Sequence, residues 1–139
     1  TVILAKSYRN IKSVRSIENS AISSIERITR EVRDATSINP GASTFNTNPG
    51  VLALNTTNAS GTAETLRFYV SNGDLFLDRD GVNIGQLTLG EANISALVFR
   101  SISTSTTSAV KIELTIDNGS TTPFKTKNFY GTAILRTSY

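Results

Sequence analysis

The side chains with the clearest capacity for chemistry are three carboxylates that lie close together in the chain: Asp74, Asp78 and Asp80. Ca²⁺ prefers oxygen ligands of this kind, so a calcium site is one hypothesis for them. A calcium loop starting at Asp80, however, places Val82 and Ile84 where oxygen ligands are needed. The spacing therefore favours ordinary turn-forming acids over a metal site, and we expect no cofactor.

The residue types also give little support to catalysis. The 139 residues include no His and no Cys, which removes the usual general base and any thiolate nucleophile. No Gly-rich phosphate loop follows a predicted strand, and no Ser lies in a recognisable nucleophile elbow. A carboxylate pair of Asp78 and Asp80 is the remaining option, but a turn glycine follows Asp80, and Arg67 is predicted to face Asp78. We therefore expect no enzyme activity and no small-molecule substrate.

Residues 2–37 are predicted to form one long helix. Apolar residues recur at spacings of three and four, and no Pro or Gly interrupts them. The pattern comprises Leu4, Tyr8, Ile11, Val14, Ile17, Ala21, Ile22, Ile25, Ile28, Val32 and Ala35. At 1.5 Å per residue the helix would be about 54 Å long. A domain of this size cannot cover such a length, so part of the helix must project or be packed by other subunits.

The basic character of the chain belongs to this segment alone. Residues 1–38 hold seven Lys or Arg and four acids, whereas residues 39–139 hold seven of each. Lys6, Arg9, Lys12 and Arg15 precede any acid, and their spacing of three makes them spiral around a helix rather than form a flat patch. Contacts to DNA, to anionic lipid headgroups and to neighbouring subunits all remain open, and DNA is the least favoured of the three.

The chain after Pro40 is predicted to form antiparallel strands. Residues 39–63 suggest a long loop with one short strand at 51–54. Asn72-Gly73 is a strong hairpin signal, and a two-residue turn there would pair Val70 with Leu75, Phe68 with Leu77 and Arg67 with Asp78. Further strands are expected at 75–79, 86–88, 94–103, 110–116 and 124–136. The connections are too short for crossover helices, which indicates antiparallel pairing.

The predicted fold class is therefore α+β, with a long N-terminal α-helix packed on a small antiparallel β-sheet. Residues 1–38 would form the helix and residues 39–139 the globular head, as a single domain. The sheet needs a cover for its apolar face, and the C-terminal half of the helix is the only candidate. Ile25, Ile28 and Val32 are the residues expected to hold the helix against the sheet.

This order of elements resembles the type IV pilin family, and the minor pilins and pseudopilins in particular. Residues 25–38 are similar to the end of the long pilin helix. The segments 66–70, 86–88, 97–99 and 133–136 follow in the order of the strands in those proteins. The resemblance covers nearly the whole chain. The leader peptide and the glutamate near the mature N-terminus that mark the family are not in this sequence, and we expect them upstream of Thr1.

The resemblance implies a structural subunit of a bacterial type IV pilus or type II secretion pseudopilus filament. Its partners would be other pilin subunits, and an apolar segment upstream of Thr1 would anchor it in the inner membrane before assembly. The helix residues that would pack in the filament are Leu4, Ile11, Val14 and Ile17. The loops at 39–63, 80–93 and 104–108 would set partner contacts.

Three alternatives stay open. One is an extracellular adhesin or carbohydrate-binding β-domain on a helical stalk. Another is a minor pilin that serves DNA uptake, with the basic residues of the helix as the DNA contacts. A coiled-coil structural protein is the third, although the apolar seam drifts after Ile17 and so departs from a heptad repeat.

Overall fold

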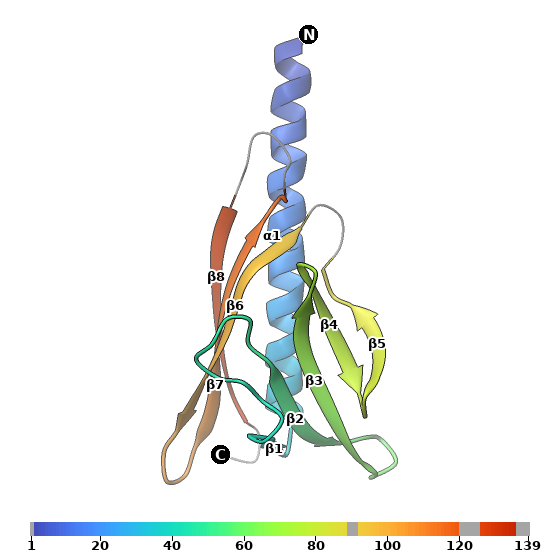
Figure 1. Ribbon diagram of the computed structural model, residues 1–139, viewed down its shortest axis with the longest axis vertical. Helices are drawn as coiled ribbons and strands as arrows, with labels where there is room; N and C mark the ends of the chain where they lie inside the picture. The colour runs from blue at the N-terminus through green and yellow to red at the C-terminus, as the bar shows by residue number, and fades with distance from the viewer. Residues whose placement is uncertain (1, 89–91, 120–125, 136–139) are drawn as a thin grey trace.

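The computed structural model describes residues 2–88, 92–119 and 126–135, with side chains described for Arg15 and from Ile17 onward. One helix, α1 (Val2–Asp34), precedes all the strands. The described strands are β1 (Ser37–Ile38), β2 (Leu52–Thr57), β3 (Ala63–Ser71), β4 (Asp74–Arg79), β5 (Val82–Gln86), β6 (Asn93–Ser103), β7 (Ser108–Asp117) and β8 (Thr126–Ile134). The N-terminal part of α1 extends past the strands, which flank the rest of the helix (Figure 1).

The strands form two antiparallel sheets, so the predicted α+β class with one small sheet is wrong. The first sheet has the order β1-β2-β3-β4-β5 and the second has the order β6-β7-β8, which makes the protein mostly β. Each sheet is a meander of sequence neighbours. Strand alternation shows where each strand lies, but it does not show that the chain leaves one sheet after β5 and begins another at β6.

The helix also ends three residues earlier than predicted. After Asp34 the chain turns away and becomes extended, and Ser37 and Ile38 pair with Asn55 and Leu54 on β2. The Thr36 amide donates to the Asn55 carbonyl at 2.8 Å, in place of a further helical bond. Sheet pairing therefore overrides the helical pattern over the last predicted turn.

The predicted hairpin register is confirmed. Val70 pairs with Leu75, Phe68 with Leu77 and Arg67 with Asp78. Asn72 and Gly73 both have positive φ, at 51° and 79°, as a two-residue type I′ turn requires. Of the other strand predictions, 94–103 matches β6 closely and 86–88 falls late, since β5 spans Val82–Gln86. The outer ends of the predicted 124–136 strand, Phe124 and Arg136, lie outside the described residues.

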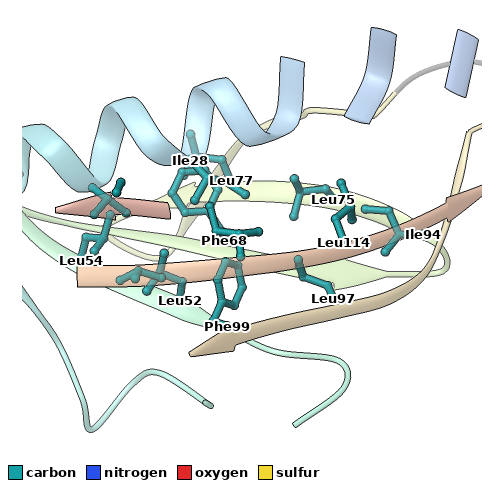
Figure 2. Close-up of a cluster of buried hydrophobic side chains, with 14 of the residues drawn as sticks. Ile28, Leu52, Leu54, Phe68, Leu75, Leu77, Ile94, Leu97, Phe99 and Leu114 are labelled. Atoms are coloured by element: carbon teal, nitrogen blue, oxygen red, sulfur yellow. The ribbon is translucent and has the colours of Figure 1, made fainter. Parts of the chain in front are cut away.

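One apolar core lies between the helix and both sheets (Figure 2). The helix contributes a buried stripe on which Ile17, Ala21, Ile28 and Val32 are each no more than 1% exposed. The largest fully buried side chains from the strands are Phe68, Leu52, Leu54, Leu66, Leu75 and Leu77 of the first sheet and Phe99, Leu97, Ile112 and Leu114 of the second. Neither sheet has a core of its own, so the helix stabilises both.

Two sets of hydrogen bonds join the sheets outside this core. The amides of Asn46 and Gly50, in the loop before β2, donate to the carbonyls of Phe99 and Leu97 on β6 at 2.9 and 2.7 Å. At another point the Ile94 amide donates to the carbonyl of Gly73, in the β3–β4 turn, at 2.8 Å. The loop before β2 and the β3–β4 turn of the first sheet are thus both fixed to β6.

The helix approaches the second sheet tightly at Gly131 on β8. A Cβ atom at this position would lie 2.7 Å from Ile25 Cγ2, which is closer than real contacts allow. Because that methyl group is on the branched Cβ of a packed residue, it cannot move aside without shifting the helix. Glycine at 131 therefore sets the spacing between α1 and β8.

We expect Gly131→Ala to lower the free energy of unfolding by about 1–3 kcal/mol, because overpacked cores lose stability on that scale. Urea denaturation followed by circular dichroism measures the change. Gly85→Ala is the matched control, since a Cβ on Gly85 of β5 meets nothing within 4 Å. Equal stability of the two variants would contradict the proposed contact.

A second expectation concerns Ser24, which is fully buried on the helix and whose hydroxyl has no hydrogen-bond partner. Ser24→Ala removes this unsatisfied group, so we expect the free energy of unfolding to rise by about 1 kcal/mol or more. Ser23→Ala, at the exposed neighbouring position, is the control and reports only the gain of about 0.5 kcal/mol from helix propensity. A loss of stability in Ser24→Ala would show that the hydroxyl is satisfied.

Candidate functional site

A polar and aromatic cluster covers the outer face of β3, β4 and β5. In the Arg67–Asp78 cluster, Arg67 Nη2 donates to Asp78 Oδ2 at 3.0 Å, and the Tyr69 hydroxyl donates to Asp78 Oδ1 at 3.1 Å. The Arg67 guanidinium lies 4.5 Å from the centre of the Tyr69 ring, and Phe76 stacks with the same ring at 5.7 Å. Asn83 completes the cluster by donating from Nδ2 to the Tyr69 hydroxyl at 3.4 Å.

This cluster is arranged for stability rather than for chemistry. Both Asp78 oxygens already accept hydrogen bonds, and the Asp78 residue is only 6% exposed. The Tyr69 ring is engaged by Arg67 and Phe76, so stacking on a ligand would displace one of them. The cross-strand pair of Arg67 with Asp78 is the one that the register predicted.

The three carboxylates considered for calcium do not converge. Asp78 belongs to the Arg67–Asp78 cluster, whereas Asp74 Oδ1 accepts from the Thr88 hydroxyl at 3.3 Å. Asp80 lies in the β4–β5 turn with φ of 51°, and its Oδ1 accepts from the Thr65 amide at 2.9 Å. Across residues 2–88, 92–119 and 126–135, no three acidic side chains come together in a way that could hold a metal ion.

The helix residues singled out from the sequence fall into two groups. Ile28 and Val32 are buried and Ile25 is partly buried, all against the common core. Ile17, predicted to pack between subunits, is 1% exposed and lies in the core of its own molecule. Arg15 is exposed. The side chains of the remaining candidates lie outside those that the structure describes: Leu4, Ile11, Val14, Lys6, Arg9 and Lys12.

Two of the grooves on the surface are lined by described residues. One, of about 310 Å³, is lined by Thr36, Ser37, Ile38, Pro40, Phe45, Ser101, Ser103, Ser108 and Leu135. It has hydroxyl and apolar groups but no charged side chain that could activate them. The other, of about 400 Å³, is lined by Glu31, Asp34, Thr56, Thr57, Asn58, Ala59, Glu64, Leu66 and Arg79. Glu31 and Glu64 are already paired with Arg27 and Arg79, and Asp34 is the third acid in the lining of this groove.

The more informative surface is apolar, and sequence reasoning missed it. Six large apolar side chains are exposed in the described part of the chain: Ile22, Val82, Ile84, Ile102, Tyr130 and Ile134. Five of them lie on β5, β6 or β8. Strand alternation would have placed Tyr130 and Ile134 on one face of β8, but it could not show that this face is the outer one.

Comparisons with known proteins add no assignment. No protein-family profile matches the chain, and no curated protein or solved structure resembles it. Within the described residues, α1 is not apolar enough over sufficient length to cross a membrane.

In the Arg67–Asp78 cluster, the contributions of the Tyr69 hydroxyl and the Asp78 carboxylate to the free energy of unfolding should depend on each other. We expect Asp78→Ala to lower the free energy of unfolding by about 2 kcal/mol, because it leaves the Arg67 and Tyr69 donors without their shared acceptor. Tyr69→Phe should cost less when Asp78 is already Ala than in the native protein. A double-mutant cycle measured by urea denaturation would give this coupling, and strictly additive effects would mean that the hydroxyl and the carboxylate do not interact.

Proposed function

We propose that this protein is a structural subunit of a bacterial type IV pilus-like or type II secretion pseudopilus filament, and that it assembles through its N-terminal helix. The observation that carries the proposal is the helix itself. It has 33 residues, and from Ile17 onward it contributes side chains to the core that it shares with both sheets. The N-terminal part extends past both sheets in Figure 1.

An extension of this kind requires a partner. The helix ahead of Ile17 would be about 22 Å long at 1.5 Å per residue. An isolated helix of this length is marginal in water, because most helical stability in proteins comes from packing of an apolar face. The sequence spacing of Leu4, Ile11 and Val14 supplies such a face, and helices of neighbouring subunits would cover it.

The proposal also implies where in the cell the protein would lie before and after assembly. Before assembly an apolar segment upstream of Thr1 would anchor it in the inner membrane, and after assembly it would face the periplasm or the cell surface within the filament. Lys6, Arg9, Lys12 and Arg15 would then lie near anionic headgroups or acidic groups of neighbouring subunits. The sheets would form the outward-facing part of each subunit.

The native protein provides the direct test. We expect it in the filament fraction sheared from the cell surface or, for a pseudopilus, in cross-linked periplasmic assemblies. Its intact mass should include about 20 apolar residues ahead of Thr1, the length that a membrane span needs. A native protein that begins at Thr1 and is released as a free monomer would contradict the proposal.

A matched pair of variants tests the role of the helix. Ile11→Asp should abolish assembly while the melting temperature of the isolated 139-residue chain stays unchanged, because the N-terminal part of α1 extends past the strands (Figure 1). Ser13→Asp, which lies outside the apolar pattern, is the control and should assemble normally. Normal assembly of Ile11→Asp would show that the helix does not mediate subunit packing at this point.

A further inference from the structure

In the described part of the chain the two sheets have four terminal strands, and two of them, β5 and β8, have an edge that is not bonded to another described strand or loop. β1 has two residues, and the edge of β6 is bonded to the loop before β2 through Phe99 and Leu97. β5 and β8 are the last strands of their sheets in the described part of the chain. They lie on opposite sides of the molecule, to the right and left of α1 in Figure 1.

The edge of β8 lacks the usual protection against pairing. Natural edge strands are shortened, bent by bulges or guarded by Pro and unpaired charges. β8 pairs with β7 over nine consecutive residues without a register shift, and contains no Pro. Its one charged residue, Lys127, is held by Glu18 of the helix. The strand is therefore long, regular and free of uncompensated charge.

Exposed apolar side chains flank this edge on both faces. Tyr130 and Ile134 project from the outer face of β8 and are 63% and 46% exposed. On the inner face, Glu18 and Ile25 of α1 contact β8 at Lys127 and Gly131. Ile22 lies between them on the same helical stripe, at spacings of four and three, and is still 49% exposed. A strand added beside β8 would cover apolar surface above and below.

The strand at the opposite edge, β5, also carries exposed apolar side chains. Its five residues carry no charge, and Val82 and Ile84 are 66% and 44% exposed. The register shifts between Leu77 and Asp78 of β4, so Ile84 has no direct partner there. Bulges of this kind re-aim a side chain. β5 is thus shorter and less regular than β8, and its Gly85 amide already donates to Asn83 Oδ1 at 2.9 Å, but β5 is the last strand of its sheet and presents β-branched apolar side chains at the opposite edge.

We propose that the β5 edge of one copy pairs with the β8 edge of a second copy. The three-stranded sheet of one molecule would continue into the five-stranded sheet of the next. Because the two edges differ and lie on opposite sides, the contact is heterologous and can repeat without closing. This inference rests on the proposed function in one respect: it assumes that many copies of the chain lie side by side, as they would in a filament.

A pairing of β8 with β8 across a two-fold axis is the alternative. It would bury Tyr130 and Ile134 but leave Val82 and Ile84 exposed in both molecules, and it would stop at a dimer. The β5–β8 contact covers exposed apolar side chains at both edges. Those side chains therefore favour the heterologous arrangement.

The chain has no Cys, so engineered thiols report contacts without background. Val82→Cys and a mass-tagged Tyr130→Cys would be mixed in equal amounts and treated with a short bis-maleimide, both as purified chain at high concentration and in sheared filaments. We expect the mixed dimer to exceed each homodimer several-fold. The double variant should give a ladder of multimers. Ser105→Cys, exposed in the β6–β7 loop, is the control for random collision.

Two results would overturn the inference. A predominance of Tyr130→Cys homodimers would establish the two-fold alternative, and mixed dimers no more abundant than those of the control would remove the contact altogether. Thr132→Glu adds an independent check. A charge on this exposed position of β8 should reduce mixed-dimer yield at least tenfold, and because the cross-strand partner of Thr132 is Lys111, the new carboxylate should leave the melting temperature unchanged. An unchanged yield would also count against the contact.

The failure of this inference can be told from that of the proposed function. Sheared filaments whose β5 and β8 thiols do not cross-link would overturn the edge contact and leave the filament in place. Cross-linking of the purified chain, together with the finding that the native cells make no filament, would support the edge contact and contradict the proposed filament.

Discussion

The whole structure depends on one shared core, in which a single helix stripe covers two sheets. Each sheet has one apolar face, and an apolar face must be buried against another element. Ile28 and Val32 belong to the same buried cluster as Phe68 of the first sheet and Ile112 of the second, and all four side chains are no more than 1% exposed. The helix is therefore not an appendage to a finished β-domain, because removing it would expose both sheets at once.

This shared core explains which positions admit no larger or more polar side chain. Gly131 lets the helix approach β8 closely, and the small Ala21 and Ser24 are fully buried on the helix. Small residues on the helix bring its axis nearer to the strands, so that long side chains from both sheets can meet beneath it. The cost is one hydroxyl group, that of Ser24, which has no partner. Outside the core, backbone bonds from the loop before β2 keep the sheets in register with each other.

Local features were predictable from the sequence, and the joining of distant segments was not. The β3–β4 register followed from Asn72-Gly73, because a two-residue turn fixes every pair along the hairpin. The helix followed from its period, although its last turn did not, since pairing of Ser37 with Asn55 depends on a strand 18 residues away. The split into two sheets was not predicted, because nothing in the residue pattern of β5 and β6 distinguishes them from neighbouring strands of one sheet. The helix residues buried against the sheets were recognisable as apolar, but no pattern separates Ile17, which is buried, from Ile22, which is exposed.

Helix packing and edge pairing would make different demands in an assembly. Apolar burial between helices is non-directional, so it can hold subunits together without fixing their rotation or their axial position. Strand pairing is directional, because a slip of one residue moves every side chain to the opposite face. The helix extends from one end of the molecule, whereas the open edges of β5 and β8 lie at its sides. A subunit that uses both surfaces would gain cohesion from the first and a defined register from the second, and neither contact could substitute for the other.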